Sequence, residues 1–78
     1  MNAEYDKLFG RNLRALRMEN NLSQEQLAAK MQLAGCDLTR SALAKIEAGQ
    51  RHIYPDELYA LQQALDVPYE RLFPAPSV

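Results

Sequence analysis

The sequence predicts an all-α fold, a compact domain of five helices. Leucine and alanine recur throughout its 78 residues, and apolar residues return at spacings of three and four, which is typical of helices with one buried face. Three glycines and six aromatic residues leave little material for a strand-rich fold. A chain of this length forms one domain with a small core, and we expect residues 5–73 to fold and residues 74–78 to form a tail.

The first helix is predicted over residues 5–20. Four large apolar residues would form its buried face: Leu8, Phe9, Leu13 and Leu16. Three basic residues lie on a separate stripe of the same helix: Lys7, Arg11 and Arg14. Because asparagine tolerates the left-handed backbone conformation, Asn20 and Asn21 are expected to end the helix.

The second helix is predicted to begin after Ser23. Ser23 and Gln26 have the spacing of a capping box, in which each side chain bonds the other residue's backbone amide. The buried side would consist of Leu27, Ala28 and Met31. Gly35 would end this helix or its last turn.

The third helix is predicted from its cap, Thr39, to about Ala48. Leu43 and Ile46 would point inward. This leaves four small or basic residues on the outer side: Arg40, Ser41, Ala42 and Lys45. Gly49 would terminate the helix.

Prolines open the last two predicted helices, at the position where a helix accepts proline best. Pro55 would begin a fourth helix with an apolar side made of Leu58, Leu61 and Leu65. Asp66 and Val67 would then turn the chain. Pro68 would open a short fifth helix that ends near Phe73.

Charge is distributed unevenly along the chain. The formal net charge is −1, but eight of the nine basic residues and only four of the ten acidic ones lie between positions 7 and 51. The basic part could face phosphates while the acidic ends face away, although a solvated surface without a partner would tolerate the same pattern. No apolar run approaches membrane-spanning length and the first residues are unlike a signal peptide, so we expect a cytoplasmic protein.

Composition disfavours catalysis and cofactor binding. The chain has one histidine, His52, and one cysteine, Cys36, and no clustered ligand spacing, so we expect no enzyme activity, no metal site and no cofactor. Asp56 and Glu57 are adjacent on a predicted helix and therefore do not face each other as paired catalytic carboxylates would. The dipole of the helix, which favours negative charge in the first turn, explains them better.

Three segments carry a resemblance to a known family. Residues 22–28 (LSQEQLA) are followed by residues 39–49 (TRSALAKIEAG), and residues 65–73 (LDVPYERLF) close the pattern. In this order and spacing, the chain from about Phe9 onward resembles the Cro and lambda-repressor-like (xenobiotic-response-element-type) helix-turn-helix family. The resemblance implies a DNA-binding transcriptional regulator, expected to be a repressor, whose third helix reads the major groove.

The third helix carries the candidate base contacts. Arg40 and Lys45 can donate to guanine O6 and N7, the commonest specific contact. Ser41 can donate or accept a hydrogen bond, and Ala42 could touch a thymine methyl group. The alternative is an ordinary solvated helix face, which would show the same residue types.

The resemblance implies further roles outside the third helix. The family glutamine that matches Gln24 contacts a DNA phosphate and braces the recognition helix, and Gln50 and Arg51 are further candidate phosphate contacts. The alternative for Gln24 is an exposed residue that merely favours helix. Arg17 and Glu47 match an arginine and a glutamate that pair across the first and third helices of the family. Their alternative is two unrelated surface charges, which would add little to stability.

The link between the second and third helices departs from the family pattern. It usually has three or four residues, whereas residues 32–38 separate Met31 from Thr39 here. The second helix could gain a turn, with Leu33 and Leu38 covering apolar surface. The longer link affects the angle between the two helices and the depth at which Arg40 enters the groove.

The C-terminal end is the best candidate for self-association. Tyr69, Leu72 and Phe73 are large for a helix of barely two turns, so some must face solvent or a partner. Because family members commonly bind double-stranded DNA as two-fold dimers, we expect a weak homodimer. The main alternative function is a protein-interaction module or an antitoxin-like partner on the same fold, which the acidic total charge and apolar C-terminus would favour.

Overall fold

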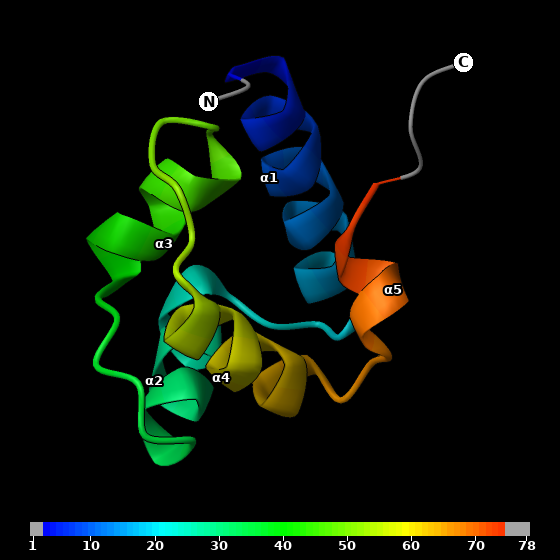
Figure 1. The fold of residues 1–78 in the computed structure, drawn as a ribbon. Coiled ribbons are helices and arrows are strands. Elements are labelled where there is room, and N and C mark those ends of the chain that lie inside the picture. Colours follow the sequence, from blue (N-terminus) through cyan, green and yellow to red (C-terminus); the bar gives the residue numbers. More distant parts are fainter. Residues whose placement is uncertain (1–2, 75–78) are drawn as a thin grey trace.

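The computed structural model describes residues 3–74 and has five α-helices and no strands in that range. The helices are α1 (Ala3–Glu19), α2 (Gln24–Leu33), α3 (Arg40–Glu47), α4 (Pro55–Leu65) and α5 (Tyr69–Leu72). In Figure 1, α1 packs beside α3, α2 packs against α3 and α4, and α5 closes against α1. The predicted all-α class with five helices is confirmed, while most of the predicted tail, residues 75–78, lies outside the described residues.

Local signals end the helices close to where the sequence predicts. The capping box of α2 is present: Ser23 Oγ accepts the Gln26 amide at 3.1 Å, and Gln26 Oε1 accepts the Ser23 amide at 2.8 Å. Thr39 caps α3 through its hydroxyl, which accepts the Ala42 amide at 3.1 Å. After α1 and α4, Asn21 and Asp66 adopt the left-handed conformation, with φ of 56° and 53°.

The core draws on all five helices. Its largest fully buried side chains are Leu13, Leu16, Leu27, Met31, Leu43, Ile46, Leu61 and Leu72. Burying each such side chain contributes about 1.5–3 kcal/mol, so the removal of any one helix would open the core to water. The inward positions of Leu43 and Ile46 fix α3 on this core and turn its opposite side outward.

Two residues expected to cover apolar surface are exposed instead. Leu8 is 37% exposed because it precedes Phe9, and neighbours on a helix lie about 100° apart around the axis. Leu33 is 90% exposed because it lies two positions after buried Met31, about 200° around α2. Both predictions were therefore wrong.

The long link between α2 and α3 is anchored to the core. Leu38 and Cys36 are buried, so the expectation that Leu38 covers apolar surface is confirmed. Gly35 has a φ of 90°, which favours glycine, and its amide donates to Gln32 O at 2.9 Å. The Cys36 amide donates to Met31 O at 3.0 Å, which closes the end of α2. The link therefore starts α3 from a fixed position.

The contact between α1 and α5 rests on a polar clamp that the sequence does not reveal. Asn12 Nδ2 donates to Arg71 O at 2.8 Å and to Leu72 O at 2.9 Å. The rings of Phe9 and Phe73 lie 5.7 Å apart beside this clamp. Leu72 is fully buried, while Phe73 keeps 42% of its surface exposed.

Two kinds of feature are absent from residues 3–74. None of the helices there is both long enough and apolar enough to cross a membrane. No three His, Cys, Asp or Glu side chains of that part of the chain gather closely enough to hold a metal ion. Burial raises the pKa of the Cys36 thiol, which keeps it in the less reactive protonated form.

Candidate nucleic-acid interface

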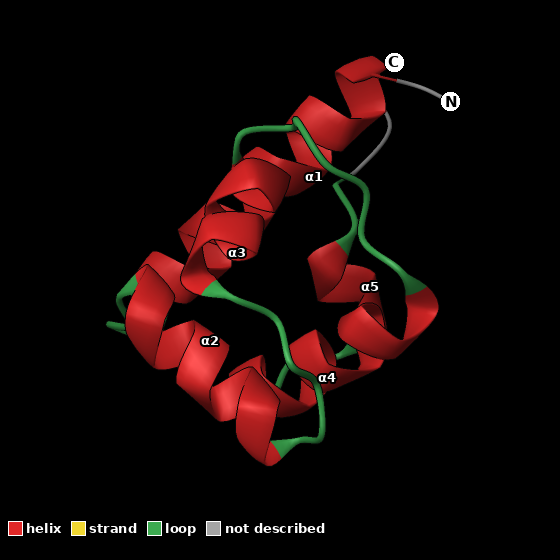
Figure 2. Cartoon of the chain, turned by 90° about the vertical axis from the view of Figure 1, so that its left-hand side faces the viewer, coloured by secondary structure: helices red, strands yellow, loops and turns green. Residues whose placement is uncertain are grey.

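Helix α3 presents a basic outer face. Arg40, Ser41 and Lys45 are exposed on the side away from Leu43 and Ile46. Figure 2 views the molecule from this side, with α3 and α2 toward the viewer. Ala42, which the sequence assigns to the outer side, is half-buried and packs against the core. Ala42 lies four positions before buried Ile46, about 40° around the helix from it, which brings its methyl group against the core edge.

A buried ion pair joins α3 to α1. Arg17 Nε lies 2.7 Å from Glu47 Oε2, and Arg17 Nη2 lies 3.1 Å from Glu47 Oε1. The two side chains are only 11% and 5% exposed. Arg17 Nη1 also donates to Leu22 O at 2.8 Å, just before α2. Two parallel bonds to one carboxylate restrict rotation as well as separation, so the pair ties the end of α3 to α1 and to the start of α2.

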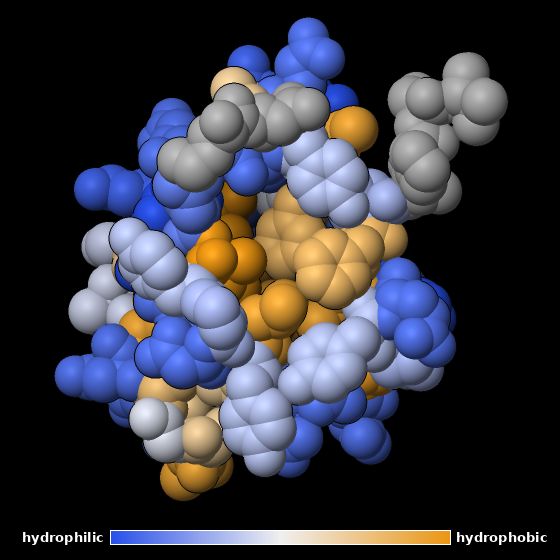
Figure 3. Space-filling model, viewed as in Figure 1, coloured by the Kyte–Doolittle hydropathy of each residue, from blue (hydrophilic) through white to orange (hydrophobic). Residues whose placement is uncertain are grey.

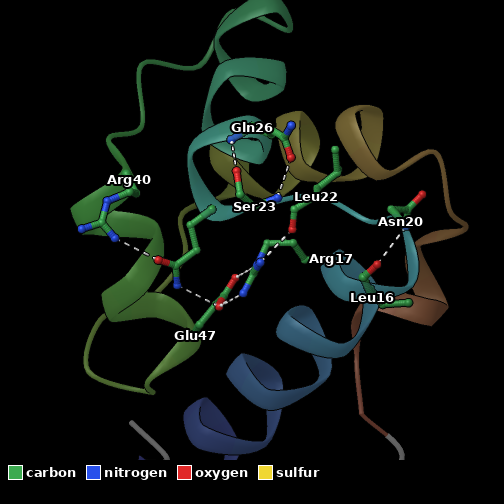
Figure 4. Close-up of polar contacts among 9 residues, drawn as sticks. Leu16, Arg17, Asn20, Leu22, Ser23, Gln26, Arg40 and Glu47 are labelled. Atoms are coloured by element: carbon green, nitrogen blue, oxygen red, sulfur yellow. Dashed lines mark hydrogen bonds and ion pairs between the residues drawn. The ribbon is translucent and has the colours of Figure 1, made fainter.

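Gln24 extends this pair to Arg40, the first residue of α3. Figure 4 shows the Arg17–Glu47 pair and the Arg40 side chain at the start of α3. Its Nε2 donates to Glu47 Oε1 at 3.1 Å, and its Oε1 accepts from Arg40 Nη1 at 3.1 Å. Because a carboxylate only accepts and a guanidinium only donates, these partners fix the amide orientation of Gln24. The result is a polar chain that runs from Arg17 through Glu47 and Gln24 to Arg40 and holds the Arg40 side chain at the start of α3.

An open hollow of about 470 Å³ lies between the first turn of α2 and the exposed side of α3. It is lined by Arg14, Arg17, Ser23, Gln24, Ala44, Glu47 and Ala48. Backbone amides in the first turn of a helix lack intrahelical acceptors, so they favour negative charge. The first turn of α2 therefore favours an anionic group at this edge of the hollow.

The connection after α3 contains a second ion pair. Arg51 Nη1 and Nη2 lie 2.8 and 2.9 Å from the two carboxylate oxygens of Glu57. The Glu57 carboxylate also accepts the Tyr54 amide at 3.0 Å, and the Arg51 guanidinium lies 5.4 Å from the centre of the Tyr54 ring. The hydrogen bonds from Arg51 hold the pKa of Glu57 below its ordinary value. The sequence interpretation assigned Glu57 to the helix dipole alone and missed this pair.

The other polar residues of this connection differ in their surroundings. Gln50 is exposed and free to reach outward. His52 Nδ1 lies 3.0 Å from Asp6 Oδ2, which ties the connection to α1. The sequence-predicted DNA residues thus fall into two groups. One group lies around α3 and the start of α2, and the other, Gln50 and Arg51, lies just beyond the end of α3.

An exposed basic helix, which packs against a capped preceding helix and is tied to α1 by a buried ion pair, is the arrangement of a helix-turn-helix DNA-binding protein. The family model described as Helix-turn-helix (HTH_3) matches residues 13–72, and the chain belongs to this family. The chain is a DNA-binding transcriptional regulator, and its family is not one of enzymes.

Two solved structures and one characterised protein are similar to the chain. Control protein C.BamHI from Bacillus amyloliquefaciens is 38% identical over 61 residues, which cover 77% of this chain and 69% of that protein. The restriction-modification controller protein C.AhdI from Aeromonas hydrophila matches with a TM-score of 0.82 and 35% identity, over 91% of this chain and 96% of its own. The DNA-binding domain of BldD matches with a TM-score of 0.79 and 31% identity, over 95% and 100%. The resemblance that the sequence motifs indicated is confirmed.

Proposed function

We propose that the chain binds a specific double-stranded DNA site and represses transcription from it, with α3 in the major groove. The observation that carries this proposal is the exposed set of Arg40, Ser41 and Lys45 on a helix held by the Arg17–Glu47 pair. Arg40 and Lys45 donate to guanine, and Ser41 bonds a neighbouring base edge. Ala42 contributes at most the exposed part of its methyl group, against a thymine methyl.

Phosphate contacts flank this helix in the proposed complex. Gln24 binds a phosphate at the first turn of α2 while it braces Arg40. Gln50 contacts the backbone beyond the end of α3. Arg51 makes three hydrogen bonds within the protein, so two of its five N–H groups are left for a phosphate.

The proposed active species is a weak homodimer, stabilised by DNA. In Figure 3, apolar side chains gather in the middle of the face formed by α1, α4 and α5. Tyr69 and Phe73, each 42% exposed, belong to α5 and the residue after it. A two-fold dimer would present two copies of α3 to half-sites about one helical turn apart.

The similarity to C.BamHI and C.AhdI points to a biological setting. C.AhdI is described as a restriction-modification controller protein, and C.BamHI as a control protein. We propose the same role for this chain, acting in the cytoplasm on the promoter of a restriction-modification system. The polar residues of α3 would then select the operator of that system.

Selection of bound sequences from a random duplex pool tests the proposed function. The expected result is a symmetric motif with two half-sites, bound with an affinity that falls as salt rises, because phosphate contacts release counterions. Recovery of no enriched sequence, together with no salt-dependent binding to any duplex, would overturn the proposal and favour a protein-interaction role.

A further inference from the structure

The basic residues without an ion pair are concentrated on one helix. Of the nine basic residues, Arg17, Arg51 and Arg71 pair with carboxylates, and Arg40 bonds Gln24. Within residues 3–74, five basic residues have neither an ion pair nor a hydrogen bond to another side chain: Lys7, Arg11, Arg14, Lys30 and Lys45. Three of these five are the stripe on α1, made of Lys7, Arg11 and Arg14, which we call the α1 stripe.

The α1 stripe is exposed and borders α3. Spacings of four and three residues place its members on one side of the helix, away from the buried face. At one end, a Cβ added to Gly49 would lie 2.6 Å from Lys7 Cγ, so Lys7 rests against the end of α3. At the other end, Arg14 lines the same hollow as Ala44 of α3 and Ala48, the residue just after α3. The stripe therefore continues the basic surface of α3 along α1.

Nearby carboxylates do not neutralise the α1 stripe. Asp6 lies 3.0 Å from His52, and Glu47 is held by Arg17 and Gln24. Glu4 shares a shallow surface hollow with Lys7 and Arg11, but it is one carboxylate beside three cations. Like charges three or four residues apart destabilise a helix slightly, so the stripe does not serve the stability of α1. A partner of opposite charge would offset this repulsion.

We propose that Lys7, Arg11 and Arg14 form a second DNA-binding surface, which contacts backbone phosphates flanking the groove that α3 enters. Seven helical residues rise about 10 Å, a length over which one DNA strand carries about three phosphates. The surface adds affinity and salt dependence without base preference, because phosphates carry no sequence information. This inference rests on the proposed function and adds contacts that lie outside the helix-turn-helix.

The test measures how salt weakens binding to a duplex that carries a single selected half-site, so that one protomer is measured. It compares three proteins: the wild type, the triple variant Lys7→Gln, Arg11→Gln and Arg14→Gln, and Lys30→Gln. Glutamine keeps helix propensity close to that of lysine and arginine, and circular dichroism checks the fold. Lys30 is the matched control, because it is exposed and has no ion pair but lies near Leu33 and Gln63, away from α3.

In a plot of log affinity against log salt concentration, the slope for the triple variant should be shallower than the wild-type slope by about three. The reason is that each phosphate contact contributes about 0.9 to the slope. Its affinity at 0.15 M salt should fall by about 100-fold. Its base preference should match the wild type, and Lys30→Gln should match the wild type in all respects. A folded triple variant with the wild-type slope would overturn the inference alone. A wild type that binds no duplex would overturn both this inference and the proposed function.

Discussion

Gly10 of α1 lies directly against the backbone of Glu47 in α3. A Cβ at position 10 would fall 2.5 Å from Ile46 O and 2.7 Å from the Glu47 carbonyl carbon, closer than a side-chain atom can approach. The absence of a side chain therefore sets the distance between α1 and α3. This contact places the Arg17 side chain, two turns further along α1, within reach of the Glu47 carboxylate.

Gly10→Ala is the first prediction. Alanine favours an isolated helix over glycine by about 1 kcal/mol, but here its methyl group would force α1 and α3 apart. The substitution is expected to lower the free energy of unfolding by about 1–3 kcal/mol, measured by urea denaturation. Ala15→Gly, at an exposed position of α1, is the control and should cost about 0.5–1 kcal/mol from helix propensity alone. A more stable Gly10→Ala protein would contradict the close contact.

The Arg17–Glu47 pair gives the second prediction. Glu47→Ala leaves the Arg17 guanidinium largely buried without its carboxylate, which should cost about 3 kcal/mol of unfolding free energy. The double variant Arg17→Met, Glu47→Leu should cost less than Glu47→Ala, because it leaves no buried charge unpaired. Urea denaturation of Arg17→Met, of Glu47→Leu and of the double variant forms the cycle. Additive costs would mean that the two charges act independently.

The helix ends and the core were accessible from the sequence because their signals are local. Ser23, Thr39 and Asn21 act on residues within four positions, and helical periodicity correctly located Leu43 and Ile46. Leu8 and Leu33 misled because apolar character was read without the angle around the helix. Leu8 lies about 100° around α1 from buried Phe9, and Leu33 lies about 200° around α2 from buried Met31.

The contacts that position the candidate site were harder to predict. Asn12 reaches backbone carbonyls about sixty positions away, and Gly10 meets α3 only because the helices pack in one particular way. No periodic pattern joins Arg51 to Glu57, since a loop separates them. The resemblance to a family supplied the matching positions of Arg17 and Glu47, which residue chemistry alone left as two surface charges. The link from Gln24 to Arg40 depends on side-chain geometry that spacing does not define.

Base readout is the third prediction. Arg40→Ala and Lys45→Ala should each lower affinity for the selected site by about 1–3 kcal/mol and broaden the preference at one base pair. Fluorescence anisotropy with the selected site and its single-base variants measures both effects. Equal loss of affinity on every sequence would reassign these residues to phosphate contacts.

The Arg51–Glu57 pair leads to the fourth prediction, on acid stability. Hydrogen bonds from Arg51 hold the pKa of Glu57 below its ordinary value of about 4.5, so the carboxylate stabilises the folded chain above that pH. The contribution is lost as pH falls through the lowered pKa. The difference in unfolding free energy between wild type and Glu57→Gln should therefore be constant near neutral pH and shrink below about pH 4.5. Asp56→Asn, at an exposed neighbouring position, is the control, and a difference that grows in acid would contradict the pairing.

Self-association is the last prediction. One recognition helix spans a short stretch of groove and gains few phosphate contacts, so a dimer is needed for a long site. The apolar face around α5 is the surface available for it, and Phe73 contributes a ring that is 42% exposed and packs on Phe9. Sedimentation of the wild type should show a monomer that gives way to a dimer as concentration rises. Phe73→Ser should weaken association by about 10-fold, because it removes about 1.4 kcal/mol of apolar burial.

The control for this measurement is Met18→Ser. Met18 is 57% exposed and lies about 120° around α1 from Asn12, whose amide binds α5, so its replacement removes exposed apolar surface outside the α1–α5 contact. Association of this variant should match the wild type. Binding to DNA gives the most sensitive test of dimerisation. A duplex with two selected half-sites brings two protomers to a high local concentration, which favours even a weak contact between them. A protein that stays monomeric in solution and loads the two half-sites independently would rule the dimer out.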